Sequence, residues 1–226
     1  DWKYPYLNRR GQMLWQQYGL VAAGLFESQA DIDSWPTQTF GEVKPGDIKY
    51  IDINGDGKID TNDEKPIGWA AVPEIVYGFG LSAAWKGLDC SVFFQGAGHV
   101  TLQQSGSAIQ AFSARNEDIY YNHWSEDNPN PNAKYPRLSI GSNKNNFRNS
   151  TFWQKDMSYL RLKTVEIGYN FPSKWIDPIH ISGLRIYLSG VNLLTFSKFK
   201  LWDPEVLEGQ GANYPANRIF NFGIHI

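Results

Sequence analysis

Hydrophobic and polar residues alternate along five segments of this chain, and each alternation predicts a β-strand. Successive side chains of a strand point to opposite faces, so a period of two gives one apolar face and one polar face. In segment 76–85, VYGFGLSAAW, the large apolar residues stand at every second position. We also expect a sixth strand over about 15–25. The other four segments are residues 88–96, 158–171, 184–194 and 218–226.

Segment 158–171 changes the phase of its pattern. Val165 and Ile167 belong to one apolar stripe, but Arg161 and Lys163 stand on the same stripe upstream. A soluble sheet offers no reason for that change, whereas a strand of a membrane barrel is apolar only within the lipid band. The pattern therefore predicts a strand whose charged end rises above the band.

The connections between these strands alternate in length. Lys86 and Gly87 predict a tight turn, and residues 172–183 form a moderate connection. Unstructured connections of the length seen elsewhere are uncommon in compact soluble domains, but outer-membrane barrels combine short periplasmic turns with long extracellular loops. The alternation therefore favours a barrel, with its long connections outside the cell. These long connections are residues 27–75, 97–157 and 195–217.

Residues 52–63, DINGDGKIDTND, match the pattern of a calcium-binding loop. The pattern D-x-[DN]-x-[DN]-G places oxygen ligands at alternate positions before a glycine that permits a sharp turn. Four carboxylates in twelve residues also repel one another without a cation. We expect a structural Ca²⁺ that braces an extracellular loop. The predicted ligands are Asp52, Asn54, Asp56, the carbonyl of Lys58, Asp60 (directly or through water) and Asp63.

This loop departs from an EF-hand in two respects. Its twelfth position is Asp63, whose side chain is shorter than the usual glutamate, and no flanking helices are expected, since Lys65-Pro66 follows. A turn rich in Asp, Asn and Gly without metal is the alternative.

The composition of the chain excludes some classes of partner and of fold. The 226 residues contain 21 Lys and Arg against 23 Asp and Glu, a net charge of −2 at pH 7. This balance provides no basic patch, so we expect no nucleic-acid partner. A single cysteine, Cys90, excludes an internal disulfide framework. Aromatic residues make up 15% of the chain, which suits a soluble β-sandwich, a sugar-binding β-module or a barrel with aromatic girdles.

Two groups of chemically interesting residues fit structured loops better than an active site. His123–Asp127 precedes a run of Asn and Pro typical of turns. Asp203 and Glu205 would form a glycosidase pair only if their carboxyl groups faced each other in a cleft. We therefore expect no catalytic residue and no enzyme activity. Short helical turns are expected at 27–34 and within about 107–121.

Several stretches together resemble SusC/RagA-type TonB-linked (TonB-dependent) outer-membrane transporters, specifically their C-terminal part. The resemblance covers most of the chain and is more specific than any single motif. The matching stretches are 18–26 with 44–50 and the calcium-type loop, 77–79 through 93–96, 123–124 with 130–138, and 158–163 with 192–195, 203–205 and the closing strand.

This resemblance implies an all-β fold, with residues 1–226 forming the C-terminal section, about six antiparallel strands, of a large transmembrane β-barrel. The calcium-type loop at 52–63 would lie in one of its long extracellular loops. Family members resemble 22-stranded barrels with an N-terminal plug and a TonB box, both of which we expect to lie outside this chain.

The resemblance also implies a cellular location and binding partners. The protein would reside in the Gram-negative bacterial outer membrane, in contact with lipid. It would import a nutrient, either a glycan or oligosaccharide or a peptide, with a SusD-like surface lipoprotein as partner and TonB coupled through the missing N-terminal part. No residue is assigned to substrate contact. A soluble, calcium-stabilised, β-rich carbohydrate-binding module is the alternative.

Overall fold

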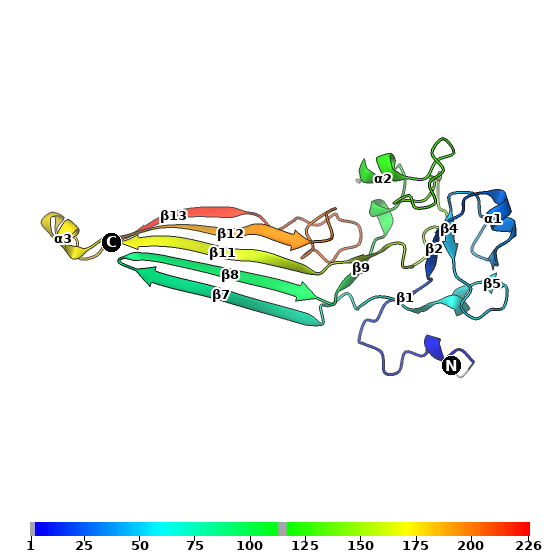
Figure 1. Cartoon of the computed structure of the whole chain (residues 1–226), viewed down its shortest axis with the longest axis horizontal. Coiled ribbons are helices and arrows are strands. Elements are labelled where there is room, and N and C mark those ends of the chain that lie inside the picture. The colour runs from blue at the N-terminus through cyan, green and yellow to red at the C-terminus, as the bar shows by residue number, and fades with distance from the viewer. Residues whose placement is uncertain (1–2, 113–116) are drawn as a thin grey trace. The chain divides into compact units, whose positions relative to one another are not determined.

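A computed structural model describes residues 3–112 and 117–226 of the chain (Figure 1). The chain divides into two compact units, and each unit combines segments that are distant in the sequence. The first unit comprises Asp1–Val72, Val100–Asp156 and Leu207–Asn213. The second comprises Pro73–His99, Met157–Val206 and Tyr214–Ile226.

The second unit is a five-stranded antiparallel sheet, which confirms the five strands expected from alternation. Neighbouring strands follow the order β13-β12-β11-β8-β7. The β7–β8 hairpin turns at Lys86 and Gly87, whose φ angles of 49° and 90° are those favoured by tight two-residue hairpins. The strands are β7 (Ile75–Trp85), β8 (Leu88–Gly98), β11 (Tyr159–Asn170), β12 (Arg185–Ser197) and β13 (Ile219–His225). A short helix α3 (Ser173–Ile176) and a 3-10 turn η4 (Asp177–Ile179) connect β11 to β12.

The phase change in β11 has a different cause from the one predicted. Leu162 pairs with Phe94 and Thr164 pairs with Phe93, so Lys163 is an extra residue in the strand, a β-bulge. The bulge brings Leu162 onto the same face as the apolar residues that follow it. The prediction that Arg161 continues the apolar stripe is therefore wrong, because one inserted residue reverses the side on which each later residue points.

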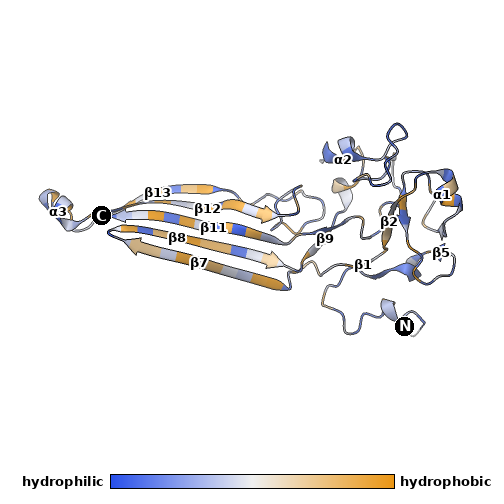
Figure 2. Cartoon of the chain, viewed as in Figure 1, coloured by the Kyte–Doolittle hydropathy of each residue, from blue (hydrophilic) through white to orange (hydrophobic). Residues whose placement is uncertain are grey.

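With this correction, the pairing register places apolar residues on one face of the sheet across all five strands. Figure 2 shows hydrophobic and hydrophilic residues interspersed along these strands. Many of these side chains are exposed: Leu81 is 76% and Leu188 is 62% accessible. The opposite face is mainly polar or small. The apolar face includes Tyr77, Phe79, Leu81, Trp85, Val92, Phe94, Leu162, Val165, Ile167, Ile186, Leu188, Leu194, Phe220, Phe222 and Ile224.

The first unit is built from short paired strands and turns. The single strand expected over 15–25 is wrong: β1 (Tyr18–Gly19) and β2 (Ala22–Leu25) are separate and pair with different partners. β1 pairs with β6 (Lys65–Pro66), β2 with β4 (Ile48–Tyr50), β9 (Thr101–Gln103) with β10 (Gln154–Asp156), and β3 (Thr37–Gln38) in parallel with β5 (Lys58–Ile59).

Helical segments of the first unit are short. The expected turn at 27–34 is confirmed as α1 (Gln29–Asp33). Within the expected range 107–121, a 3-10 turn lies at the start and α2 (Glu117–Asn122) lies at the end, and residues 113–116 lie outside the described part. Across the described residues, no helix combines the length and apolar character that crossing a membrane requires. The 3-10 turns are η1 (Pro5–Leu7), η2 (Thr61–Asp63) and η3 (Gly106–Ala108).

A buried polar network organises the core of the first unit. Asp47 is fully buried, and its carboxylate accepts hydrogen bonds from the side-chain amides of Asn143 (3.0 Å) and Asn146 (2.8 Å) and the backbone N–H of Lys44 (2.8 Å). Arg137 completes the site as an ion pair at 2.8 Å. These partners come from two of the three long connections, 27–75 and 97–157, so residues expected to be irregular loops form a core of their own.

Candidate functional site

The calcium-type loop folds as a chain of turns in which side-chain oxygens accept backbone hydrogen bonds. Asp52 accepts from the N–H groups of Gly55 (2.7 Å) and Gly57 (2.8 Å). Asn54 accepts from the N–H of Asp56 at 2.9 Å, and Asp56 in turn accepts from the N–H of Lys58 at 2.9 Å. These contacts gather the first four predicted ligands in one turn, in which Asp52 and Asn54 are half-buried and Asp56 and Lys58 are exposed.

Asp63, at the end of the loop, is fully buried and closes it. Its carboxylate accepts from the N–H groups of Ile53 (2.8 Å), Asn54 (3.3 Å) and Asp60 (2.8 Å). Asp60 accepts from the N–H of Asn62, so the two acids cap η2 reciprocally. Within the described residues, no three His, Cys, Asp or Glu side chains are arranged as a group that could hold a metal ion.

The polar face of the second unit carries a cluster of opposite charges. Arg185 on β12 pairs with Asp89 on β8 and, at 2.7 Å, with Glu166 on β11. Asn170 adds a hydrogen bond to Asp89 at 3.0 Å. Room for the guanidinium comes from Gly168, because a Cβ atom there would lie 2.4 Å from an Arg185 nitrogen. The cluster therefore links three strands on the face opposite the apolar one.

Known proteins similar in sequence to this chain identify its family. No protein-family model matches the chain. TonB-dependent receptor P26 of Formosa agariphila is 33% identical over 218 residues, which is 90% of this chain. TonB-dependent receptor SusC of Bacteroides thetaiotaomicron is 24% identical over 81% of this chain. The chain belongs to the TonB-dependent receptors of the SusC/RagA type.

The chain spans only about a fifth of these receptors: 20% of P26 and 18% of SusC. The solved structure of the RagAB peptide transporter has the same fold in the matching region, with a TM-score of 0.67 over 92% of this chain and 22% of that one. Its sequence identity of 23% supports the fold alone. The segment is thus mostly strands with little helix, as in the corresponding part of that receptor, and no closed barrel forms within its described residues.

A second charged cluster of this receptor segment holds the connection between β12 and β13. Arg161 is 1% exposed and pairs with Asp203 and, at 2.8 Å, with Glu205. Glu205 also accepts hydrogen bonds from Lys163 (3.3 Å) and the hydroxyl of Tyr159 (3.1 Å). The two acids therefore fasten this connection to β11, and the paired partners explain their presence without catalysis.

The electrostatics of Asp203 follow from its partners. Burial alone opposes its ionisation, but the N–H of Glu205, the guanidinium of Arg161 and the N–H of Ala216 together outweigh burial and lower its pKa. The sequence pattern predicts a structured loop for Asp203 and Glu205 but does not identify Arg161 as their partner. The available signal was a pair of cations on a strand otherwise rich in apolar residues.

The residues around His123 also have structural roles. The Nδ1 atom of His123 lies 2.8 Å from the carbonyl oxygen of Tyr120 at the end of α2. Trp124 packs against Gly46, where a Cβ atom would lie 2.2 Å from the indole ring. Gly46 is therefore required for this packing, and its φ of 83° also favours glycine.

Proposed function

We propose that this receptor segment is part of the wall and extracellular loops of an outer-membrane transporter that imports a nutrient with energy supplied through TonB. The apolar face of the five-stranded sheet is the observation that carries this proposal. The face is continuous through the bulge in β11, and most of its leucines and phenylalanines are exposed.

Lipid contact resolves the unfavourable exposure of this face. Burying apolar surface contributes roughly 25 cal/mol per Å², so a stripe of exposed Leu, Ile and Phe across five strands is costly in water. Alternation between a lipid-facing and a lumen-facing side is the pattern of transmembrane barrels. The ion pairs of Arg185 lie on the opposite face, which would line the lumen.

The barrel itself extends beyond these strands. Five strands cannot close around a lumen of transporter size, so β7 and β13 would pair with strands from the rest of the receptor. The expectation from sequence is about six strands from residues 1–226 within a larger transmembrane barrel. It becomes part of this proposal with five strands in the sheet.

Neighbouring residues on β12 provide a matched test. Leu188 lies on the apolar face and Ser189 on the opposite face. In the complete receptor, Leu188→Lys should reduce the amount recovered in the outer-membrane fraction, because a lysine at mid-membrane costs about 2–4 kcal/mol. Ser189→Lys should change recovery little. Equal recovery of both variants, or a wild-type receptor found soluble in the periplasm, would refute the proposal.

The partners follow from the proposed transport role. A SusD-like surface lipoprotein would cap the extracellular side, which the first unit would contribute to, and TonB would act through a part of the receptor outside residues 1–226. The substrate is a glycan or oligosaccharide or a peptide. Two of the similar proteins are named TonB-dependent receptor SusC and the RagAB peptide transporter. They support nutrient import in general.

Calcium binding at residues 52–63 is a separate part of the proposal. Asp52, Asn54, Asp56, the Lys58 carbonyl, Asp60 and Asp63 would supply the oxygens. The bound Ca²⁺ would brace the β3–β5 pair, since Lys58 begins β5.

Catalysis has no place in this function. The relatives that match the chain are receptors and transporters, and the acids that could have formed a glycosidase pair are held by Arg161. A free-standing carbohydrate-binding module receives no support from these relatives.

A further inference from the structure

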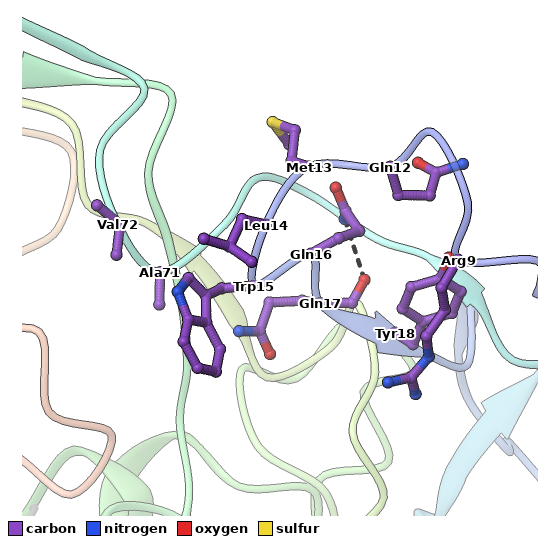
Figure 3. Close-up of a pocket in the computed structure, with 10 residues that line it drawn as sticks. All are labelled: Arg9, Gln12, Met13, Leu14, Trp15, Gln16, Gln17, Tyr18, Ala71 and Val72. Atoms are coloured by element: carbon purple, nitrogen blue, oxygen red, sulfur yellow. Dashed lines mark hydrogen bonds between the residues drawn. The ribbon is translucent and has the colours of Figure 1, made fainter.

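Several carboxamide side chains of the first unit donate hydrogen bonds to backbone carbonyls. The side-chain amide of Gln16 donates to the carbonyl of Gln17 at 3.0 Å, as Figure 3 shows. Gln38 (3.0 Å) and Asn145 (2.9 Å) both donate to the carbonyl of Ile48. These amides have a structural role, because each one holds a neighbouring segment of backbone in place.

The carboxamide of Asn54 has a different setting, because it lies in a turn beside a glycine. Its oxygen accepts from the N–H of Asp56 at 2.9 Å, and its nitrogen donates to the Asp56 carboxylate at 3.2 Å. Gly55 lies between these two residues with φ of 73°, a conformation that favours glycine. Asparagine is a chemically labile residue, and a following glycine has no side chain to hinder attack by its backbone nitrogen on the asparagine side chain.

A carboxylate contacts the nitrogen that would attack. Oδ1 of Asp52 accepts the N–H of Gly55 at 2.7 Å, within the distance of about 2.6–3.2 Å that a general base requires. The other oxygen of Asp52 accepts the N–H of Gly57 at 2.8 Å, which fixes the orientation of the carboxylate. Asp63 holds the backbone N–H of Asn54 at 3.3 Å. The base and the attacking nitrogen are therefore held together before any reaction begins.

The side-chain carbonyl of Asn54 also has a donor where negative charge would develop. The N–H of Asp56 lies 2.9 Å from this oxygen, within the range of about 2.7–3.1 Å for groups that stabilise an oxyanion. The amide nitrogen, which would leave, is held by the carboxylate of the same residue. Residues 52–56 thus bring together a base, a nucleophile, an electrophilic carbon and an oxyanion donor.

We propose that Asn54 is a site of self-catalysed deamidation in the folded protein. The backbone nitrogen of Gly55 gives its proton to Asp52 and forms a bond to Cγ of Asn54. The bond between Cγ and Nδ2 then breaks, and the proton passes from Asp52 through water to the departing nitrogen, which leaves as ammonia. The remaining ring is a succinimide, and no atom has been oxidised or reduced.

Water opens the succinimide in one of two ways. Attack at Cγ breaks its bond to the Gly55 nitrogen and leaves aspartate at position 54. Attack at the backbone carbonyl carbon breaks the original peptide bond instead and leaves isoaspartate, in which the chain runs through the side chain. Either product replaces a neutral amide with a carboxylate, so the loop at 52–63 gains negative charge as the protein ages. This modification goes beyond the import function and depends neither on it nor on Ca²⁺.

The test follows conversion in the complete receptor, held in EDTA so that bound Ca²⁺ does not contribute. Trypsin cleaves after Lys49 and Lys58 and releases residues 50–58, in which Asn54 is the sole asparagine. Mass spectrometry detects the change from amide to acid, and an isoaspartyl methyltransferase labels isoaspartate. Digestion in heavy-oxygen water marks any conversion that occurs during digestion. The receptor should convert at least about tenfold faster than a synthetic peptide of residues 50–58, a modest share of what a positioned base contributes.

Asp52→Asn keeps a hydrogen-bond acceptor for Gly55 but removes the base, so it should slow conversion to the rate of the peptide. Glu64→Gln is the matched control, because it also changes one carboxylate to an amide, and Glu64 pairs with Arg148 at 2.6 Å instead. This variant should convert like wild type. The inference is overturned if the wild-type receptor converts no faster than the peptide, or if the two variants convert equally. The first comparison uses wild type alone, so it decides the matter even where a variant fails to fold.

Discussion

The two units differ in whether their large apolar side chains are buried or exposed. In the first unit, Leu20, Ile48 and Ile59 are completely buried, as is the hydrogen-bonded carboxylate of Asp47. In the second unit, side chains of the same kind, such as Leu81 and Leu188, are largely exposed on one face of a sheet. The first arrangement is that of a structure folded for water, whereas the second needs an apolar environment supplied from outside.

The largest expected effect is on the buried charge of the first unit. Asp47→Ala leaves Arg137 without its buried partner and removes acceptors for Asn143 and Asn146. Breaking a buried pair in this way costs about 3–5 kcal/mol. Hydrogen exchange should show faster exchange in residues 44–50 and 143–153, while β11 and β12 keep their protection. Uniform loss of protection in both units would show that they do not differ as described.

Calcium removal should have a smaller effect, confined to the first unit. If the loop at 52–63 binds Ca²⁺, a hundredfold excess over Kd stabilises the folded state by about 2.7 kcal/mol. EDTA should therefore increase proteolysis near β3 and β5, and added Ca²⁺ should reverse the change. Asp52→Asn should weaken this response. No response in the wild-type receptor, together with no bound ion by elemental analysis, would refute the calcium proposal.

The smallest expected effect concerns acid in the second unit. The folded pKa of Asp203 is below its usual value, so its contribution to stability is present above about pH 4 and is lost as pH falls through the folded pKa. Because its partner Arg161 is charged at all these values, acid should loosen the connection between β12 and β13. We expect a change of at most about 1 kcal/mol.

Proteolysis of that connection at decreasing pH measures the effect. Asp203→Asn should be cut more readily near neutral pH and should show a weaker acceleration in acid than wild type. If the variant and wild type accelerate equally, other carboxyl groups control this connection.

The five strands of the sheet could be predicted from sequence because each is long enough to display a period of two. The bulge could not, since a phase change in 158–171 fits both a change of environment and an inserted residue, and only the pairing of Leu162 and Thr164 with β8 distinguishes them. The strands of the first unit have two to four residues, too few to establish any period.

The sites were predictable only where their residues are adjacent in sequence. The calcium-type loop is one continuous motif, so its six candidate ligands can be read from residues 52–63 alone, and Ca²⁺ binding there stays a prediction. Asp47 and Arg137 are separated by 90 positions. The sequence around either residue therefore does not predict that the two form an ion pair.

The bulge in β11 extends across the sheet as a defect of increasing size. Between the same two rungs of the ladder, β8 has no intervening residue, β11 has Lys163, and β12 has Asn192 and Leu193. This resembles a dislocation in a crystal, where extra rows of atoms enter on one side and the lattice must bend around their edge. The ladder of this sheet is therefore irregular along this line, at the level where Arg161 and Lys163 form ion pairs with Glu205.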